Sequence, residues 1–284
     1  MQPKHLMLIL LIMILYGSSY PVGKLGINTI PPLLFTALRV GLIFLAFLPF
    51  FKFRLPEKKL IMPLIAFSLI MGIGTYAILY FALERLTIVA PIIIGSQTAI
   101  PIGLLLSLFI LKESVSFKKW ILIIISFIGI IIIAYDPRIV DDKFALLLIL
   151  GTSFFFALAN MMARVLKNVD TAVLNGWHGL ISFIPVILLS LYFEGNPINY
   201  LYPIDGVTLF AVLHTALIVS VIGHAGMFYL YKFYPVTNVL PFYSLFPIFG
   251  ILLTFLIFGE VPTILFIIGG TIVISSVFLL HKIR

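Results

Sequence analysis

Residues 86–111 read LTIVAPIIIGSQTAIPIGLLLSLFIL, a run without one charged side chain. The chain of 284 residues contains seven uncharged runs of at least twenty residues, and 60–83, 144–163 and 233–259 are three others. A helix needs roughly 20 apolar residues to cross the hydrocarbon core of a bilayer, which is about 30 Å thick. The sequence therefore predicts an all-α integral membrane protein that crosses the bilayer several times.

Composition and charge narrow the class of protein further. Hydrophobic residues make up 62% of the chain and charged residues 10%, with a mean hydropathy of +1.25, so a soluble fold would expose a very large apolar surface. The 18 Lys and Arg are spread over short loops, which argues against a nucleic-acid-binding face and favours anionic membrane lipid as their partner. The chain has no cysteine, which excludes disulfides and thiolate metal sites, and we expect no cofactor.

Charges and clusters of proline and glycine divide the chain into ten predicted transmembrane helices. They cover residues 5–22, 31–51, 60–82, 88–111, 118–135, 144–166, 171–193, 206–231, 237–258 and 261–281. Alternate connecting segments carry 13 Lys and Arg, whereas the opposite set carries 4. Since positively charged loops stay in the cytoplasm, we expect both termini there, in a multi-pass protein of a bacterial inner membrane.

An internal repeat accounts for this number of helices. A shift of 147 residues superposes identical residues, including scarce glycines and acids. The pairs are Phe81 and Phe228, Leu83 and Leu230, Gly103 and Gly250, Ile110 and Ile257, and Glu113 and Glu260. We therefore predict two five-helix halves, residues 1–140 and 141–284, the second inverted in the membrane because five is odd. Inverted repeats around a central cavity are typical of secondary transporters, and chance similarity between apolar helices is the alternative.

Several short motifs add a resemblance that covers nearly the whole chain. They are YGSSYPVGK at residues 16–24, Pro31-Pro32 with Arg39, LKE at 111–113 and FGE at 258–260. In these motifs the chain resembles the EamA family of the drug/metabolite transporter superfamily. Tyr16 stands where that family usually has Trp, and Gly259 where it often has an acid. Residues 26–32 and 233–241 look most like its cysteine and O-acetylserine exporter branch. The resemblance implies ten helices in two inverted halves and export of amino acids or related metabolites.

Prolines interrupt two predicted helices that correspond in the repeat. Pro91 and Pro101 lie in the fourth helix, and Pro241 and Pro247 lie in the ninth. A proline removes a helical hydrogen bond, and the freed carbonyl must be satisfied by protein or by water in a cavity. Broken helices at matching positions favour a binding site between the halves, and kinks used only for packing are the alternative.

Polar side chains at helical spacing fall next to these breaks. We expect a central cavity that holds a small polar solute. Its predicted lining is Tyr76, Tyr80, Gln97, Asn160, His224, Tyr243 and Ser244. Hydroxyl, amide and imidazole groups of this kind donate and accept hydrogen bonds. The alternative is that each of them bonds across helices and only stabilises packing.

Charged residues near or inside the helices are further candidates. Arg39 lies well inside the second predicted helix, where a charge is costly unless it meets water or a partner. A substrate carboxylate and a structural partner are the alternatives, and His178 is its approximate counterpart in the second half. Glu113 and Glu260 end the fourth and ninth helices. We expect each to bind amides at the start of the following helix, with proton transport as the alternative.

The sequence predicts a secondary transporter and not an enzyme. We expect a small polar metabolite, an amino acid or a derivative, to be exported by alternating access. Uptake or exchange of a larger metabolite, such as S-adenosylmethionine or a nucleotide sugar, is the main alternative. The sequence has no HExxH motif, which argues against an intramembrane metalloenzyme. It has no acidic residue in the middle of a predicted helix, which argues against an exporter of lipophilic cations. A channel or receptor is a further alternative. Protons are a candidate coupling ion through His178, His214 or His224, and we expect a monomer or a homodimer.

Overall fold

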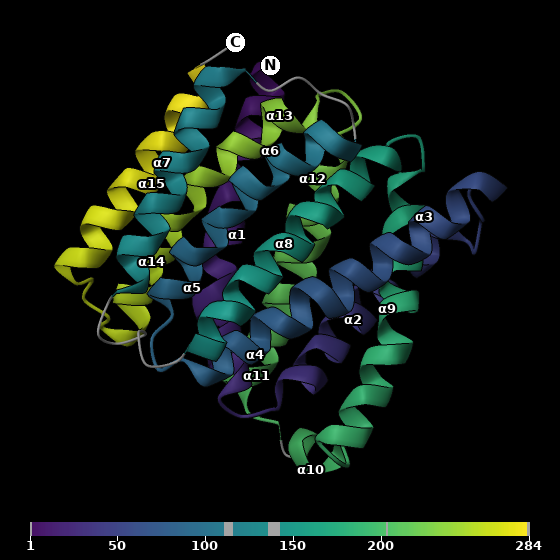
Figure 1. Cartoon of the computed structure of the whole chain (residues 1–284). Helices are drawn as coiled ribbons and strands as arrows, with labels where there is room; N and C mark the ends of the chain where they lie inside the picture. The colour runs from purple at the N-terminus through teal and green to yellow at the C-terminus, as the bar shows by residue number, and fades with distance from the viewer. Residues whose placement is uncertain (1, 111–115, 136–142, 203, 283–284) are drawn as a thin grey trace.

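The computed structural model describes residues 2–110, 116–135, 143–202 and 204–282, and all regular structure in them is helical (Figure 1). The first helices are α1 (Pro3–Ile27), α2 (Pro32–Phe51), α3 (Lys58–Leu69), the π-helical η1 (Ile70–Ala77), α4 (Ile78–Arg85), α5 (Ala90–Gly95), the 3-10 helix η2 (Ser96–Thr98), α6 (Ala99–Ile110) and α7 (Phe117–Ala134). The later ones are α8 (Lys143–Val165), α9 (Thr171–Phe193), α10 (Ile198–Leu201), α11 (Gly206–Leu213), the π-helical η3 (His214–His224), α12 (Ala225–Leu230), α13 (Val236–Val239), the 3-10 helix η4 (Leu240–Leu245), α14 (Phe246–Phe258) and α15 (Ile264–Lys282).

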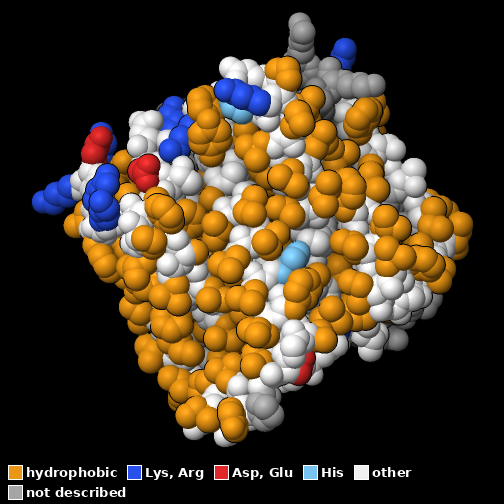
Figure 2. All heavy atoms as spheres, turned by 180° about the vertical axis from the view of Figure 1, so that it is seen from behind, with side chains coloured by type: hydrophobic (Ala, Val, Ile, Leu, Met, Phe, Trp, Pro, Cys, Tyr) orange, Lys and Arg blue, Asp and Glu red, His pale blue; other side chains and the backbone are white. Residues whose placement is uncertain are grey.

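Seven helical segments of the described residues are long and apolar enough to cross a bilayer. They are Pro3–Ile27, Pro32–Phe51, Lys58–Arg85, Ala90–Phe109, Phe144–Val165, Thr171–Phe193 and Gly206–Leu230. Two more apolar helices, Phe246–Phe258 and Ile264–Ser276, are shorter. The molecular surface in Figure 2 is largely hydrophobic, and Lys and Arg gather near one end of it. This arrangement confirms the predicted all-helical, multi-pass membrane protein, because only a lipid environment accommodates such a surface.

Helices from the early and late parts of the chain pack against each other. The most extensive pairs are α2 with α9, α7 with α15, and α1 with α14. The start of α1 and the end of α15 lie at the same end of the bundle (Figure 1). Helix α1 also contacts η3 and α11, so it runs through the interior with second-half helices around it.

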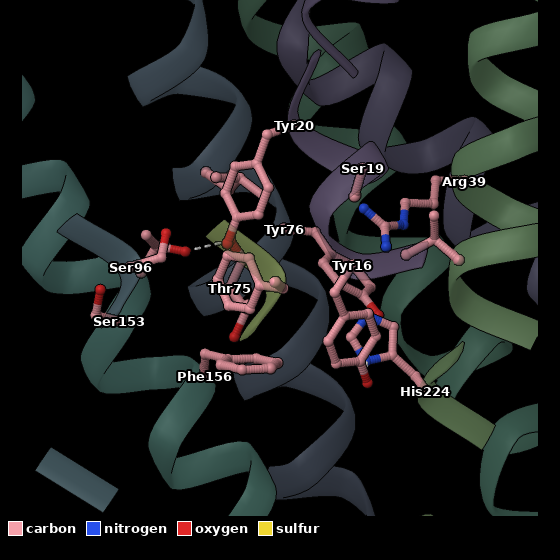
Figure 3. A pocket seen from close by; sticks show the side chains of 14 residues that line it. Tyr16, Ser19, Tyr20, Arg39, Thr75, Tyr76, Ser96, Ser153, Phe156 and His224 are labelled. Carbon is pink, nitrogen blue, oxygen red and sulfur yellow. Dashed lines mark hydrogen bonds between the residues drawn. The ribbon is translucent and has the colours of Figure 1, made fainter. Parts of the chain in front are cut away.

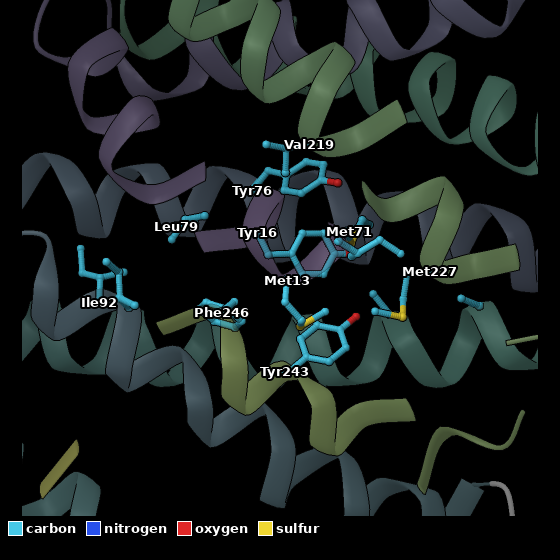
Figure 4. Packing of buried hydrophobic residues seen from close by; sticks show 14 of the residues in the cluster. Met13, Tyr16, Met71, Tyr76, Leu79, Ile92, Val219, Met227, Tyr243 and Phe246 are labelled. Carbon is cyan, nitrogen blue, oxygen red and sulfur yellow. The ribbon is translucent and has the colours of Figure 1, made fainter. Parts of the chain in front are cut away.

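The interior around α1 is filled by flexible and aromatic side chains (Figure 4). Met13 packs there with Met71, Met227, Tyr243 and Phe246, all of them buried. Lipid tails are as apolar as these side chains, so close van der Waals packing and hydrogen bonds between helices hold the bundle together in place of the hydrophobic effect. A buried polar group in this interior is consequently informative about the site.

Candidate functional site

Helix α2 carries Arg39 into the interior, where the residue is 1% exposed. Its Nε donates to Ser220 Oγ at 3.0 Å, and its Nη1 donates to the Tyr80 hydroxyl at 2.6 Å. The guanidinium carbon lies 4.0 Å from the centre of the Tyr76 ring, which is a cation–π contact. Among the described residues the one ion pair joins Lys59 and Glu57, which are both exposed. The charge of Arg39 therefore meets hydroxyl and aromatic partners but no carboxylate of the described chain.

Two of these partners lie in π-helical stretches, Tyr76 in η1 and Ser220 in η3, and Tyr80 follows η1 in α4. In η1, Thr75 Oγ1 donates to the carbonyl oxygen of Ile70 at 3.2 Å, and in η3, Ser220 Oγ donates to the carbonyl oxygen of Thr215 at 3.0 Å. Each bond spans five residues, the spacing of a π turn. A π turn holds more residues than an α turn and changes the face that later residues present. Such turns are frequent at functional sites.

A cavity with about 490 Å³ of space free of protein atoms lies beside Arg39 (Figure 3). Three of the predicted substrate residues line it, namely Arg39, Tyr76 and His224. The other lining residues are Tyr16, Ser19, Tyr20, Thr75, Leu79, Ser96, Thr152, Ser153, Phe156, Val219 and Phe246.

Sequence reasoning missed most of the polar lining, although some signals were present. Tyr16, Ser19 and Tyr20 belong to the motif at residues 16–24, but a motif does not show which face of its helix points inward. Ser96 and Phe156 lie on segments that were expected to line the cavity. In both cases the sequence indicated the correct helical segment, but it indicated Gln97 and Asn160 as the lining side chains in place of Ser96 and Phe156.

Four predicted lining residues, Tyr80, Gln97, Asn160 and Tyr243, are buried but do not line the cavity. Asn160 Oδ1 accepts from the hydroxyls of Tyr231 at 2.9 Å and Tyr243 at 3.2 Å. Gln97 Nε2 donates to the carbonyl oxygen of Tyr243 at 3.2 Å, and its Oε1 has no partner among the described residues. These bonds connect helices behind the wall, which favours the packing alternative for this group.

An aromatic layer lies between this network and the cavity. The Tyr16 hydroxyl and His224 Nδ1 are 2.8 Å apart and share a hydrogen bond. The Tyr16 ring lies 5.5 Å from that of Tyr243 and 6.5 Å from that of Phe156, measured between centroids. Tyr16 precedes Ser19 along α1, so the layer closes the cavity toward the end of the bundle where α1 begins.

His178 lies outside the cavity wall. Its Nδ1 is 3.1 Å from Ser182 Oγ, which in turn donates to the carbonyl oxygen of Ser68 at 2.8 Å. Its Nε2 has no partner among the described residues, and its ring lies 6.0 Å from that of Tyr76. Ser182 thus ties α9 to α3, and His178 lies beside it, directly behind the Tyr76 ring that contacts Arg39.

Glu260 binds helix-start amides, but not those of the following helix. Its carboxylate accepts from the amides of Val89 at 2.8 Å and Ala90 at 3.2 Å, at the start of α5. The expected partner, the start of α15, was wrong because the chain folds the end of α14 back against α5, whose first amides have no helical acceptor. The Glu194 carboxylate likewise accepts from the first amides of α2, that of Leu33 at 2.7 Å and that of Leu34 at 2.8 Å.

The predicted proline interruptions coincide with helix starts and 3-10 turns. Pro91 is the second residue of α5, Pro101 follows η2 within α6, and Pro247 is the second residue of α14, which directly follows η4. The backbone of Pro241 and Ser244 lies in η4, and their side chains are outside the described part of the structure. Glu113 also lies outside the described residues.

The chemistry of the cavity is that of binding. Within the described residues no group of three or more His, Cys, Asp or Glu could hold a metal ion. The wall instead offers one guanidinium, one imidazole, several hydroxyls and aromatic faces. These groups recognise a polar solute through charge and hydrogen bonds.

Comparison with known proteins identifies the family. The EamA-like transporter family matches residues 3–135 and 143–281. Proteins named "Probable amino-acid metabolite efflux pump" from Salmonella typhimurium (strain LT2) and Escherichia coli (strain K12) are 24% and 25% identical over 290 residues, which covers 98% of this chain and 95% of each relative. A solved crystal structure with a TM-score of 0.70 and 15% identity, covering 99% of both chains, shares the fold. This chain therefore belongs to the EamA-like transporter family, and it is a membrane transporter, not an enzyme.

Proposed function

We propose that the protein exports a small amino-acid metabolite that bears a carboxylate, across a bacterial inner membrane. The observation that carries the proposal is Arg39, a buried cation in the cavity wall without a carboxylate partner in the described chain. An uncompensated buried charge costs several kcal/mol, and a ligand carboxylate would offset much of that penalty. The bidentate geometry of guanidinium suits a carboxylate better than it suits a neutral group.

The relatives support the direction and the class of substrate. Two proteins that align with 98% of this chain are named as efflux pumps of amino-acid metabolites.

We further propose ten membrane crossings in two inverted halves, residues 1–140 and 141–284, with both termini in the cytoplasm. The family matches the chain twice, at residues 3–135 and 143–281, which supports the repeat. The start of α1 and the end of α15 lie at one end of the bundle, as an even number of crossings requires (Figure 1).

Alternating access is supported by contacts that close the bundle on both sides of the cavity. Toward the start of α1, Tyr16 and its aromatic neighbours close it, and Arg164 donates to the carbonyl oxygen of Tyr231. Toward the end of α1, Lys24 Nζ donates to the carbonyl oxygens of Leu83 and Leu86 at 2.6 and 2.8 Å. Opening one set while the other stays closed would expose the cavity to each compartment in turn.

Counterflow in proteoliposomes tests the function. Purified protein is reconstituted with unlabelled amino acids inside, and uptake of labelled L-cysteine, O-acetyl-L-serine and nucleotides is followed at two pH values. We expect saturable accumulation of an amino-acid tracer, lowered about tenfold or more by Arg39→Gln. Arg54→Gln, which changes an exposed arginine, is the matched control and should retain wild-type rates. Accumulation of nucleotides alone, or equal rates in Arg39→Gln and wild type, would contradict the proposal.

A further inference from the structure

The two ends of the cavity differ in chemistry (Figure 3). Arg39, Ser19 and His224 lie together on one side of the view, and Ser96 and Ser153 lie on the other side. Arg39 is the one charged residue in the wall formed by the described chain. A ligand that spans the cavity therefore meets different partners at its two ends.

The end formed by Arg39 is a donor pole. A guanidinium has five N–H donors, and Arg39 uses one for Ser220 and one for Tyr80. That leaves three N–H groups, which the Tyr76 hydroxyl and a ligand can share. His224 Nδ1 is engaged with Tyr16, and no described residue bonds its Nε2. This pole matches an anionic acceptor such as a carboxylate.

The opposite end is an acceptor pole. Ser96 and Ser153 each donate to the carbonyl oxygen four residues back, at 2.6 and 2.7 Å, and Thr152 donates to the carbonyl oxygen of Thr75 at 2.8 Å. A hydroxyl has a single proton, so these oxygens face a ligand only as acceptors. Ser153 Oγ also lies 3.3 Å from the carbonyl oxygen of Gly95, so two carbonyl oxygens share its proton. Tyr20 hydrogen-bonds Ser96 and occupies part of its acceptor capacity (Figure 3), so the Ser153 oxygen has more acceptor capacity left for a ligand.

We infer that Ser153, with Ser96 beside it, selects ligands that present an N–H donor opposite the carboxylate held by Arg39. The inference rests on the proposed function and names the substrate class more closely: a carboxylate at one end and an ammonium or amide N–H at the other. The acceptor pole formed by these residues consists of neutral oxygens. It therefore forms no ion pair with a ligand that carries a further positive charge besides its ammonium group.

A competition experiment separates the two poles. Labelled O-acetyl-L-serine is the counterflow tracer. The competitors are γ-aminobutyrate, whose ammonium lies at the opposite end from its carboxylate, its N-trimethyl derivative without any N–H, and its carboxamide without a carboxylate. In the wild type, N-trimethylation should raise the half-inhibitory concentration about fivefold or more. In Ser153→Ala, that ratio should fall below about twofold, while the penalty for the carboxamide persists.

Ser107→Ala is the matched control. Ser107 is also a buried helical serine that donates to a carbonyl oxygen of its own helix, at 2.8 Å, but it does not line the cavity. It should keep the wild-type ratio. If Ser153→Ala also keeps that ratio while the tracer accumulates normally, the inference is overturned and the proposed function stands. If folded wild-type protein accumulates no tracer and none of the amino-acid panel, the proposed function fails, and the inference fails with it.

Discussion

Replacing Gly17 by alanine tests the closest helix contact beside the cavity. A Cβ at this position would lie 2.6 Å from the carbonyl oxygen of Phe246 and 2.7 Å from the backbone nitrogen of Gly250. Ordinary contacts of this kind begin near 3.4 Å, so α1 would have to move away from α14 by about 0.8 Å. Both obstacles are backbone atoms, which no rotamer change removes. Overpacking of this kind costs about 1–3 kcal/mol.

Gly151→Ala is the control for the change in helix propensity. Gly151 also lies inside a helix, but its nearest neighbour would be a methyl carbon of Ile78 at 4.0 Å, an ordinary contact. Both variants gain about 1 kcal/mol of helix propensity, so their difference isolates the overpacking term.

Samples of each variant are heated in detergent, and size-exclusion chromatography then measures the folded fraction that remains, which gives the melting temperature. We expect Gly17→Ala to melt at least about 3 °C below Gly151→Ala. Counterflow should also be slower, because α1 and α14 carry the stacked rings of Tyr20 and Phe246, 5.6 Å apart, in the cavity wall. Equal melting temperatures for the two variants would refute the close approach.

Four other substitutions test contacts at helix ends. Glu260→Gln should lower stability by about 1–2 kcal/mol, since its half-buried carboxylate accepts backbone amides. Glu57→Gln should leave the stability nearly unchanged because its ion pair with Lys59 is exposed, and equal shifts in melting temperature for the two variants would count against this account. Gly259→Ala should cost about 1 kcal/mol in denaturant unfolding, since φ is +67° there, and an unchanged midpoint would show that the turn is not left-handed. Hydrogen bonds from the Thr208 hydroxyl and amide hold the pKa of Asp205 below its ordinary value of 3.8, so the stability it adds is present above about pH 4 and is lost as pH falls through the lower folded pKa. The melting temperatures of wild type and Asp205→Asn should therefore converge on acidification, and a constant gap would contradict this.

The helical, membrane-spanning character of the chain follows from sequence alone. Inside lipid every backbone amide must be satisfied by protein, and uncharged runs of twenty or more residues, such as residues 86–111, do so as helices. The motifs at residues 16–24 and 258–260 correctly indicated the family. These features depend on local composition and order, which the sequence contains directly.

The site was predictable only in part, and the π-helical turns show why. Tyr76 and Tyr80 have the spacing of neighbours on one α-helical face, yet Tyr76 lines the cavity while Tyr80 lies behind it and bonds Arg39. The π turns of η1 insert extra residues and rotate the faces that follow, which a period of 3.6 residues does not anticipate.

Sequence by itself therefore determined that the chain is an all-helical membrane protein and which of its apolar segments carry polar groups. Only the tertiary structure decided which of those groups meet: Arg39 against Tyr76, and Glu260 against the start of α5 rather than the helix that follows it. The physical reason is that periodicity fixes the face on which a side chain lies, whereas its partner depends on the packing of helices that are far apart in the chain and similar in apolar composition.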